Sequence, residues 1–412
     1  MGMASDHWSP AVVFLEDINL LACFGRSFSI LKEETKMQVN IERETLLKGI
    51  GHALGVVDKR GSLPILSHCL LQTNGNGVFI SATDLEISFR GFYPAEVAEP
   101  GALTVQAGFF NNLIKDLPKG PLALVGTDKA AMEIRTGDSH YQLYGLAAAE
   151  FPSIPEAAEE NLVEVESRVL KEMINKTIFS VSGEDLQFNL SGIFWEKVET
   201  EKGIFLRLVS TDGHRLTLVE RVISESEQLD LGEGILVPFK AMREIGRFLD
   251  GQEKVTLGLS KKTLALQAAD KHLFVRLLDR KFPEYRRIIP EGFAYRFSVN
   301  RKEITDTLKR IAQLSSDRFK GVIFNLAADS AEVTFANPDV GEGRELLTVN
   351  LEAGDADQLP LEVGFNARYL LEPLQVMTSD TIFLEINDRD HPCRIMGPGD
   401  THYFSLVMPM SL

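Results

Sequence analysis

The spacing of apolar and polar residues along the chain changes in the same way at three places. Strand-like alternation of period two gives way to apolar residues at helical spacing in 39–48, 163–174 and 297–308. A second helical pattern follows each time, at 109–117, 239–249 and 365–374. The chain is therefore predicted to repeat one unit that contains strands and two helices.

Short landmarks recur in the same order within these units. Asp84, Asp212 and Asn337 each end a strand pattern, and an aromatic residue or Met followed by Pro closes each unit at 151–152, 282–283 and 408–409. Corresponding landmarks lie about 125 to 130 residues apart, a normal domain length. We predict an α+β protein of three repeated domains, 37–157, 158–290 and 291–412, each with two helices packed on antiparallel sheets.

Residues 1–36 lack the landmarks and are expected to be a disordered extension or the result of an upstream start site. Cys23, Cys69 and Cys393 are too far apart for a metal site or a disulfide framework, which fits a reducing cytoplasm. The sequence has no long apolar run, so no membrane span is expected.

The composition limits how the protein could bind nucleic acid. The net charge is -16 at pH 7, so DNA would not be held by the surface as a whole. Basic residues nevertheless gather on and near the six predicted helices, as at Lys171, Lys176, Lys240 and Arg247. These helices could line one positive surface that contacts phosphates without reading bases, or they could simply be solvated helix faces.

The string Asp212-Gly213-His214-Arg215 is the most enzyme-like part of the sequence. A hydrolase or transferase could use Asp212 and His214 as an acid–base pair. The other two repeats have no His at the matching positions, and no phosphate loop or zinc spacing is present. We therefore expect no catalytic residue, no metal and no cofactor.

The repeat, together with the strings at 63–66, 82–86, 211–216, 282–287 and 407–410, resembles the beta subunit of bacterial DNA polymerase III, the sliding clamp. The resemblance runs from Met37 to Leu412. It implies the DNA clamp fold, a ring made by a head-to-tail homodimer, and a non-catalytic processivity factor. The implied partners are duplex DNA of any sequence, the polymerase III alpha subunit, a clamp loader, and other polymerases and repair proteins. The implied location is cytoplasmic and associated with the nucleoid.

The resemblance also implies the functional residues. A pocket between domains 2 and 3 would take a short peptide with a Gln and apolar anchors, while Arg and His at its rim would hold the peptide's polar groups. The matching positions are Thr211, Gly213, His214, Arg215, Leu216, Pro283, Arg287, Ile288, Tyr369, Leu406, Met408, Pro409 and Met410. Adaptable Met side chains suit a surface that takes several partners. Without the resemblance, the ending around Met408 would be interpreted as a plain edge strand.

DNA contacts are implied for Arg60, Lys240 and Arg247, and contacts between subunits for Tyr141, Leu143 and Leu314. Three positions depart from the family pattern. The loop at 184–189 carries two carboxylates where DNA contact is expected, Ser411 replaces a frequent arginine, and Gln313 is more polar than usual. A monomeric interaction module that does not encircle DNA is therefore the alternative within this fold.

Overall fold

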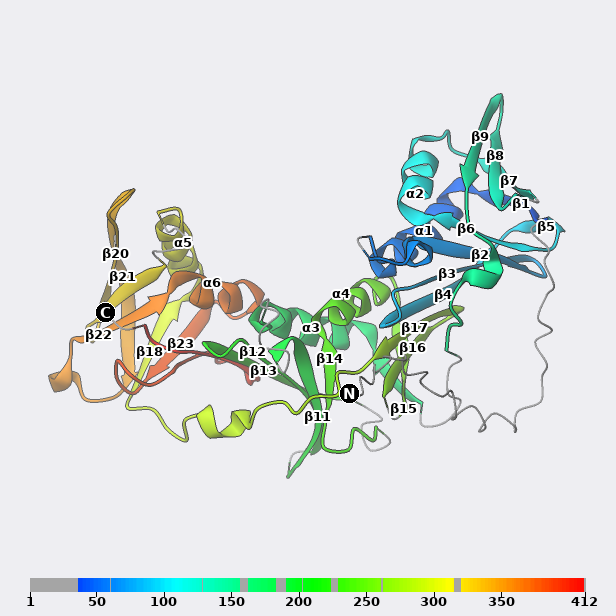
Figure 1. Ribbon diagram of the computed structural model, residues 1–412. Helices are drawn as coiled ribbons and strands as arrows, with labels where there is room; N and C mark the ends of the chain where they lie inside the picture. The colour runs from blue at the N-terminus through cyan, green and yellow to red at the C-terminus, as the bar shows by residue number, and fades with distance from the viewer. Residues whose placement is uncertain are drawn as a thin grey trace, which may run out of the picture. The chain divides into compact units, whose positions relative to one another are not determined.

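The computed structural model describes residues 36–412 except 60, 128, 156–161, 183–189, 202, 224–228, 261, 315–319 and 411–412. Within this part, one order of elements occurs three times: a strand, a helix, a group of strands, a second helix and three more strands (Figure 1). The expected α+β repeat with two helices in each domain is confirmed. No helix of the described residues is long and apolar enough to cross a membrane.

The bounds of the elements show how closely the three repeats agree. Domain 1 contains β1 (Gln38–Glu42), α1 (Arg43–Val56), β2 (His68–Asn74), β3 (Gly77–Thr83), β4 (Ile87–Pro94), β5 (Glu96–Glu99), β6 (Ala102–Gln106), α2 (Ala107–Asp116), β7 (Pro121–Thr127), β8 (Ala131–Thr136) and β9 (Ser139–Tyr144). Domain 2 contains β10 (Val163–Glu166), α3 (Ser167–Thr177), β11 (Gly192–Thr200), β12 (Gly203–Thr211), β13 (Arg215–Val222), β14 (Ile235–Pro238), α4 (Phe239–Phe248), β15 (Lys254–Ser260), β16 (Thr263–Ala268) and β17 (Lys271–Arg276). Domain 3 contains β18 (Tyr295–Asn300), α5 (Arg301–Ala312), β19 (Gly321–Leu326), β20 (Ser330–Asn337), β21 (Gly341–Ala353), β22 (Leu361–Asn366), α6 (Ala367–Val376), β23 (Thr381–Ile386), β24 (Cys393–Gly397) and β25 (Asp400–Val407).

Two of the sheets are continuous across domain boundaries. Strand β17 of domain 2 pairs antiparallel with β4 of domain 1, and β25 of domain 3 pairs antiparallel with β13 of domain 2. The sheets therefore have eight strands (β10-β15-β16-β17-β4-β3-β2-β6) and twelve strands (β14-β11-β12-β13-β25-β24-β23-β18-β21-β20-β19-β22), beside a five-stranded sheet of domain 1 alone (β5-β1-β7-β8-β9). Each boundary is held by backbone hydrogen bonds as well as by side chains.

The helices pack against one another in a continuous series, α2–α1–α4–α3–α6–α5, that also crosses both domain boundaries. Helix α4 shows why they lie as they do. Ala241, Met242, Ile245 and Phe248 are buried, whereas Arg243 and Arg247 are exposed. The apolar stripe of the helix faces the sheets and its basic residues face solvent.

The landmark at Asp84, Asp212 and Asn337 is a turn that each side chain closes. Asp84 Oδ1 accepts hydrogen bonds from the backbone N–H groups of Glu86 (2.9 Å) and Ile87 (2.6 Å). The carboxylate of Asp212 does the same for the residues two and three positions later, and Asn337 Oδ1 accepts from Asp339 N at 3.1 Å. A short side-chain acceptor that can fold back on its own backbone explains why Asp or Asn recurs here.

Most buried side chains form one large apolar core, but a second, smaller cluster lies on the opposite face of the central sheet. Trp195 of β11 faces the main core, and its neighbour Phe194 packs on the second cluster. The members of this second cluster are Leu190, Val209, Leu216, Leu218, Leu236, Phe282, Tyr285 and Leu406. Phe282 and Tyr285 come from the segment that joins domains 2 and 3, so the cluster attaches this segment to the sheet.

Candidate functional site

The turn between β12 and β13 presents the string that suggested an active site. Asp212 Oδ1 accepts hydrogen bonds from His214 N (3.0 Å) and Arg215 N (3.1 Å), and Asp212 Oδ2 accepts from Arg215 Nε at 3.0 Å. The His214 ring instead stacks beside the Tyr369 ring, with centroids 6.4 Å apart. The carboxylate is thus used to shape the turn, and Gly213, at φ +89°, completes it.

Arg215 does not stand at an open rim. Its side chain is only 5% exposed, and each of its three guanidinium nitrogens has a partner: Asp212, Glu372 of α6 and the carbonyl of Phe179. The guanidinium carbon also lies 4.4 Å from the centre of the Tyr369 ring. Arg215 therefore joins domain 2 to α6, and its contact with a peptide stays a prediction.

The C-terminal residues cross from domain 2 to domain 3. Strand β25 lies between β13 and β24, and Met408, Pro409 and Met410 follow it outside the named strands. Beyond it, Met408 N donates to His214 O (2.9 Å) and Met410 N donates to Gly364 O (2.8 Å). The backbone is held at both points, while the side chains of Met408 and Met410 remain 40% and 39% exposed.

The segment that joins domains 2 and 3 carries the remaining residues of the predicted peptide pocket. Phe282 and Tyr285 are buried in the second apolar cluster beside Leu216 and Leu406. Between and beyond them Pro283 and Arg287 are exposed, and Ile288 is 50% exposed. The structure therefore places buried Leu216 and Leu406 beneath the segment that carries the exposed side chains.

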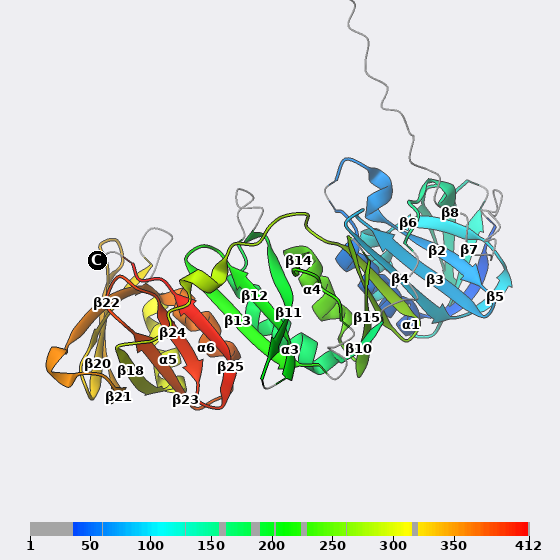
Figure 2. The same cartoon turned by 90° about the horizontal axis from the view of Figure 1, so that it is seen from below.

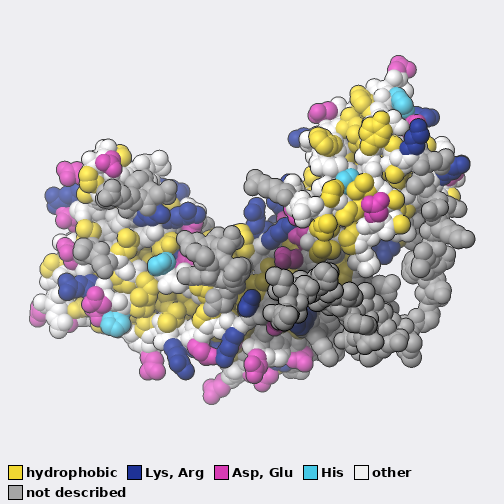
Figure 3. Space-filling model, in the orientation of Figure 1, with side chains coloured by type: hydrophobic (Ala, Val, Ile, Leu, Met, Phe, Trp, Pro, Cys, Tyr) yellow, Lys and Arg dark blue, Asp and Glu magenta, His cyan; other side chains and the backbone are white. Residues whose placement is uncertain are grey.

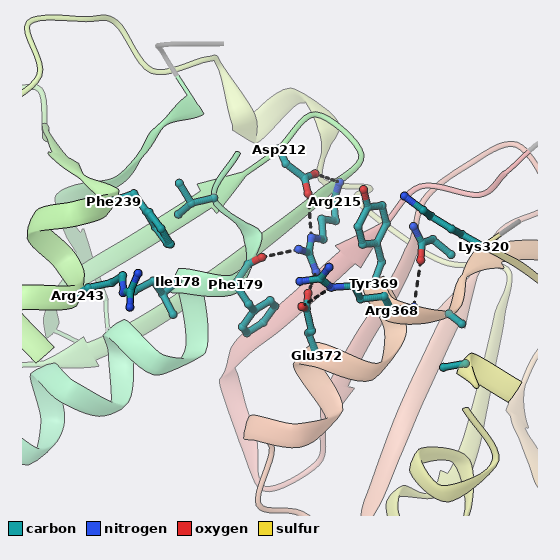
Figure 4. Close-up of a pocket in the computed structure, with 14 residues that line it drawn as sticks. Ile178, Phe179, Asp212, Arg215, Phe239, Arg243, Lys320, Arg368, Tyr369 and Glu372 are labelled. Atoms are coloured by element: carbon teal, nitrogen blue, oxygen red, sulfur yellow. Dashed lines mark hydrogen bonds and ion pairs between the residues drawn. The ribbon is translucent and has the colours of Figure 1, made fainter. Parts of the chain in front are cut away.

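A cavity of about 930 Å³ at the boundary of domains 2 and 3 is lined in part by Asp212 and Arg215 (Figure 4). Helix α4 contributes Phe239 and Arg243 to its wall, and α6 contributes Arg368, Tyr369 and Glu372. In Figure 4, Asp212, Arg215 and Glu372 form a hydrogen-bonded group between the two sides. Burial, followed by the nearby charge of Asp212, raises the pKa of Tyr369, so its hydroxyl stays protonated at neutral pH.

The sequence found part of this cavity wall and missed the rest. Only Arg215 and Tyr369 among the predicted pocket residues line it. Arg368 and Glu372 were missed, although their spacing of four positions on one predicted helix is a usable signal, and they form an ion pair at 2.8 Å. The link from Glu372 to Arg215 joins residues 157 positions apart, which no local pattern predicts.

The predicted DNA contacts are described only in part. Arg60 and the loop at 184–189 lie outside the described residues. Lys240 pairs with Asp84 and lies 3.3 Å from the carbonyl of Val56, so it also joins α4 to domain 1. Arg247 is 53% exposed and pairs with Glu244 at 2.8 Å. The basic residues of α4 thus face solvent beside carboxylates that reduce their net charge.

Not every basic residue on the helices belongs to that surface. Lys176 of α3 is 4% exposed and pairs with Glu172 (2.7 Å) and with Asp400 of β25 (2.5 Å). Arg221 of β13 binds the same two carboxylates. The prediction that Lys176 contributes to a positive helical surface is wrong, because its charge is neutralised inside the boundary between domains 2 and 3.

The residues predicted to contact a second subunit come from two places, strand β9 and the turn after helix α5. Tyr141 and Leu143 are on β9, the last strand of the five-stranded sheet, and Tyr144 beside them is 78% exposed. Leu314 follows α5 and packs at the margin of the main core. Figure 3 shows hydrophobic side chains gathered over the end of domain 1 that carries α2 and β9. No group of residues with metal-binding geometry occurs in the described parts of the chain.

Comparison with known proteins assigns all three domains to one family. Family models of the DNA polymerase III beta subunit match the chain with the N-terminal domain at 37–155, the central domain at 164–284 and the C-terminal domain at 286–411. The chain is 32% identical to the beta sliding clamp of Pseudomonas putida and 31% identical to that of Vibrio cholerae, over 91% of this chain and the full length of each relative. Its fold is similar to the beta sliding clamp of Caulobacter crescentus, with a TM-score of 0.85 and 28% identity over 92% of this chain and 99% of the other. The same TM-score and identity are found for a sliding clamp of Bartonella birtlesii bound to griselimycin, over 92% of this chain and all of the other.

Proposed function

Because this chain belongs to the DNA polymerase III beta subunit family, the bacterial sliding clamps, we propose that the surface around Leu216, Ile288 and Met408 is its binding site for partner peptides. The chain is a DNA sliding clamp, a processivity factor that forms a ring as a head-to-tail homodimer, and it is not an enzyme. The hydrolase or transferase reading of Asp212 and His214 is therefore wrong.

One observation carries the proposal for the peptide site: three separate segments bring apolar side chains to one place. Leu216, Leu406 and Tyr285 pack in one buried cluster, and the half-exposed Ile288 and the partly exposed Met408 follow Tyr285 and Leu406 in the chain. An apolar surface with a rigid floor and flexible thioether side chains suits short peptides with Leu or Phe anchors. His214, with its backbone fixed by Asp212 and Met408, lies at the polar margin.

The family binds DNA and polymerases, and the individual partners of this chain are part of the proposal. They are duplex DNA of any sequence, the polymerase III alpha subunit, a clamp loader that opens the ring, and other polymerases and repair proteins with the same kind of peptide. The exposed Arg243 and Arg247 of α4 support phosphate contact without base recognition. A cytoplasmic location beside the nucleoid follows from these partners.

We propose that the subunits meet at two strand edges that have no partner strand among the described residues. Strand β9 pairs with β8 on one side and ends the five-stranded sheet. Residues 341–347 of β21 pair with β20, whereas the pairing with β18 begins only at Val349. Exposed Tyr144 on β9 and Leu346 on β21, which is 74% exposed, mark both edges as apolar. Open apolar edges favour pairing with another chain, which supports the dimer over the monomeric module.

Retention on DNA tests the topological part of the proposal. The protein would be loaded onto a nicked circular plasmid by an ATP-driven clamp loader and separated from free protein by gel filtration. We expect the protein to stay with the circle and to be released after a restriction enzyme linearises it. Equal retention on circular and linear DNA would contradict encirclement. A solution mass of one chain at micromolar concentration would favour the monomeric module.

A further inference from the structure

The segment that carries the wall of the peptide site is attached to domain 2 mainly through side chains. Leu278 N donates to Leu236 O at 2.9 Å at its start. From there to Gly292, the backbone hydrogen bonds found among the described residues stay within the segment, as between Tyr285 N and Pro283 O (2.7 Å) and between Ile289 N and Arg286 O (3.3 Å). The position of Pro283, Arg287 and Ile288 therefore depends on what holds the neighbouring side chains.

Strand β11 supplies that attachment from two residues on one face. Phe194 stacks flat on Phe282, with ring centroids 5.0 Å apart and an interplanar angle of 2°. Two positions along, Glu196 points to the same side, because alternate residues of a strand share a face. Figure 1 shows the joining segment on the side of the central sheet opposite helices α3 and α4, and Figure 2 shows the same segment from below.

Glu196 is the centre of a buried polar group that fixes the segment. Its side chain is 8% exposed. Its Oε1 accepts hydrogen bonds from Tyr285 Oη and from Arg207 Nη1 (3.1 Å), and its Oε2 accepts from Arg286 Nη2 at 2.6 Å. Arg207 also donates to Tyr285 Oη at 2.8 Å. Burial, together with the hydrogen bond to Glu196, raises the pKa of Tyr285 to about 12, so Tyr285 remains a donor.

The same group reaches the strand that forms the floor of the site. Arg207 binds Glu220 of β13 through Nε at 2.6 Å, and Glu220 Oε2 lies 3.2 Å from Nδ1 of His402 on β25. His402 in turn stacks on Phe205, with centroids 5.0 Å apart. Glu196 therefore links the joining segment to strands β12, β13 and β25, the last of which leads directly to Leu406 and Met408.

We propose that Glu196, which lies outside the peptide site, is a positioning residue that holds the 282–288 wall in the conformation that binds peptide. This rests on the proposed peptide site. Hydrogen bonds to a charged carboxylate are stronger than those between neutral groups. The three that Glu196 accepts therefore order the wall before the ligand arrives. When the binding conformation is only partly populated, the apparent affinity falls by the populated fraction.

The test measures peptide affinity in Glu196→Gln, which keeps the side chain's shape but removes its charge. A fluorescein-labelled peptide of the type Gln-Leu-x-Leu-Phe would be titrated by fluorescence polarisation at 25 °C against wild type, Glu196→Gln and the control Glu199→Gln. Glu199 lies on the same strand, and its side chain is 70% exposed. We expect about fivefold to tenfold weaker binding for Glu196→Gln and no change for Glu199→Gln.

Two further readouts separate positioning from mere loss of stability. Binding is measured well below the melting temperature of each variant, where the folded fraction stays near one, so a lower melting temperature alone does not weaken binding. In an Ile288→Ala background, Glu196→Gln should cost clearly less affinity than in wild type, because the wall that it positions has lost its main apolar contact.

The outcomes distinguish this inference from the proposed site itself. If wild type does not bind the peptide, the proposed peptide site fails. If wild type binds and Glu196→Gln binds equally well, the positioning role is refuted. An equal loss with and without Ile288 would also refute it, because Glu196 would then act independently of the wall.

Discussion

Removing the residues after Val407 should abolish peptide binding while the ring stays folded. The deletion removes two backbone hydrogen bonds, from Met408 N to His214 O and from Met410 N to Gly364 O. Together they contribute about 2 kcal/mol of stability, which corresponds to a fall of a few degrees in melting temperature. The deletion also removes Met408 and Met410, which are 40% and 39% exposed and offer that surface to a ligand. Losing both contacts should cost about 3 kcal/mol of binding free energy, or roughly 100-fold in affinity.

The assay is fluorescence polarisation of the labelled peptide, with the melting temperature and the solution mass measured on the same samples. A matched variant, Met408→Ala with Met410→Ala, keeps the chain length and both backbone hydrogen bonds. It should lose most of the affinity with a smaller change in melting temperature than the deletion. Wild-type affinity in this double variant would refute the assignment of the Met side chains to the site. A collapse of the dimer on deletion would show that the segment is structural.

The other predictions concern ring closure, DNA, the domain boundary and pH. Leu346→Asp should shift the solution mass from two chains toward one in sedimentation, and an unchanged dimer would exclude the β21 edge. Arg247→Ala should reduce the slope of log affinity for duplex DNA against log salt by about one, and an unchanged slope would exclude this side chain from the DNA surface. Arg215→Ala should lower the free energy of unfolding by about 3–5 kcal/mol, while Arg243→Ala, exposed in the same cavity, should change it little. Burial on Phe89 lowers the pKa of His52 to about 4, below its unfolded value of 6.5, so stability should fall as pH drops from 6.5 toward 4. At pH 5 this costs at most about 2 kcal/mol, and His52→Leu should remove that part of the pH dependence of the melting temperature.

The sequence predicted the repeat because the signals for it are local. The change from strand to helix spacing is present in each stretch of about ten residues, and Asp84 and Asp212 shape turns through their own backbone. The continuous sheets could not be predicted in this way. Pairing of β4 with β17 and of β13 with β25 joins strands from different domains, and the alternation within a strand does not specify its partner.

The same limit explains why the burial of two basic residues could not be predicted. Lys176 and Arg215 have the same charge in the sequence as the exposed Arg247, but their surroundings differ. Lys176 faces Asp400, 224 positions away, and Arg215 faces Glu372, 157 positions away. A buried cation must have such partners, because an unpaired charge in the interior is too costly. The sequence shows which residues are basic, but only the fold shows which of them are neutralised.

These buried pairs also bear on where the ring opens. At the boundary of domains 2 and 3, β13 pairs with β25. Two sets of ion pairs add to this pairing, one between Arg215 and Glu372 and the other among Lys176, Glu172, Arg221 and Asp400. The boundary of domains 1 and 2 combines β4 and β17 with the bridge from Lys240 to Asp84. Breaking a buried ion pair leaves an unpaired charge, and parting paired strands breaks backbone hydrogen bonds, so both boundaries resist opening. The proposed contact between subunits, at β9 and β21, includes exposed apolar side chains such as Tyr144 and Leu346. We therefore expect the ring to open between subunits, where neither of these boundaries has to be broken.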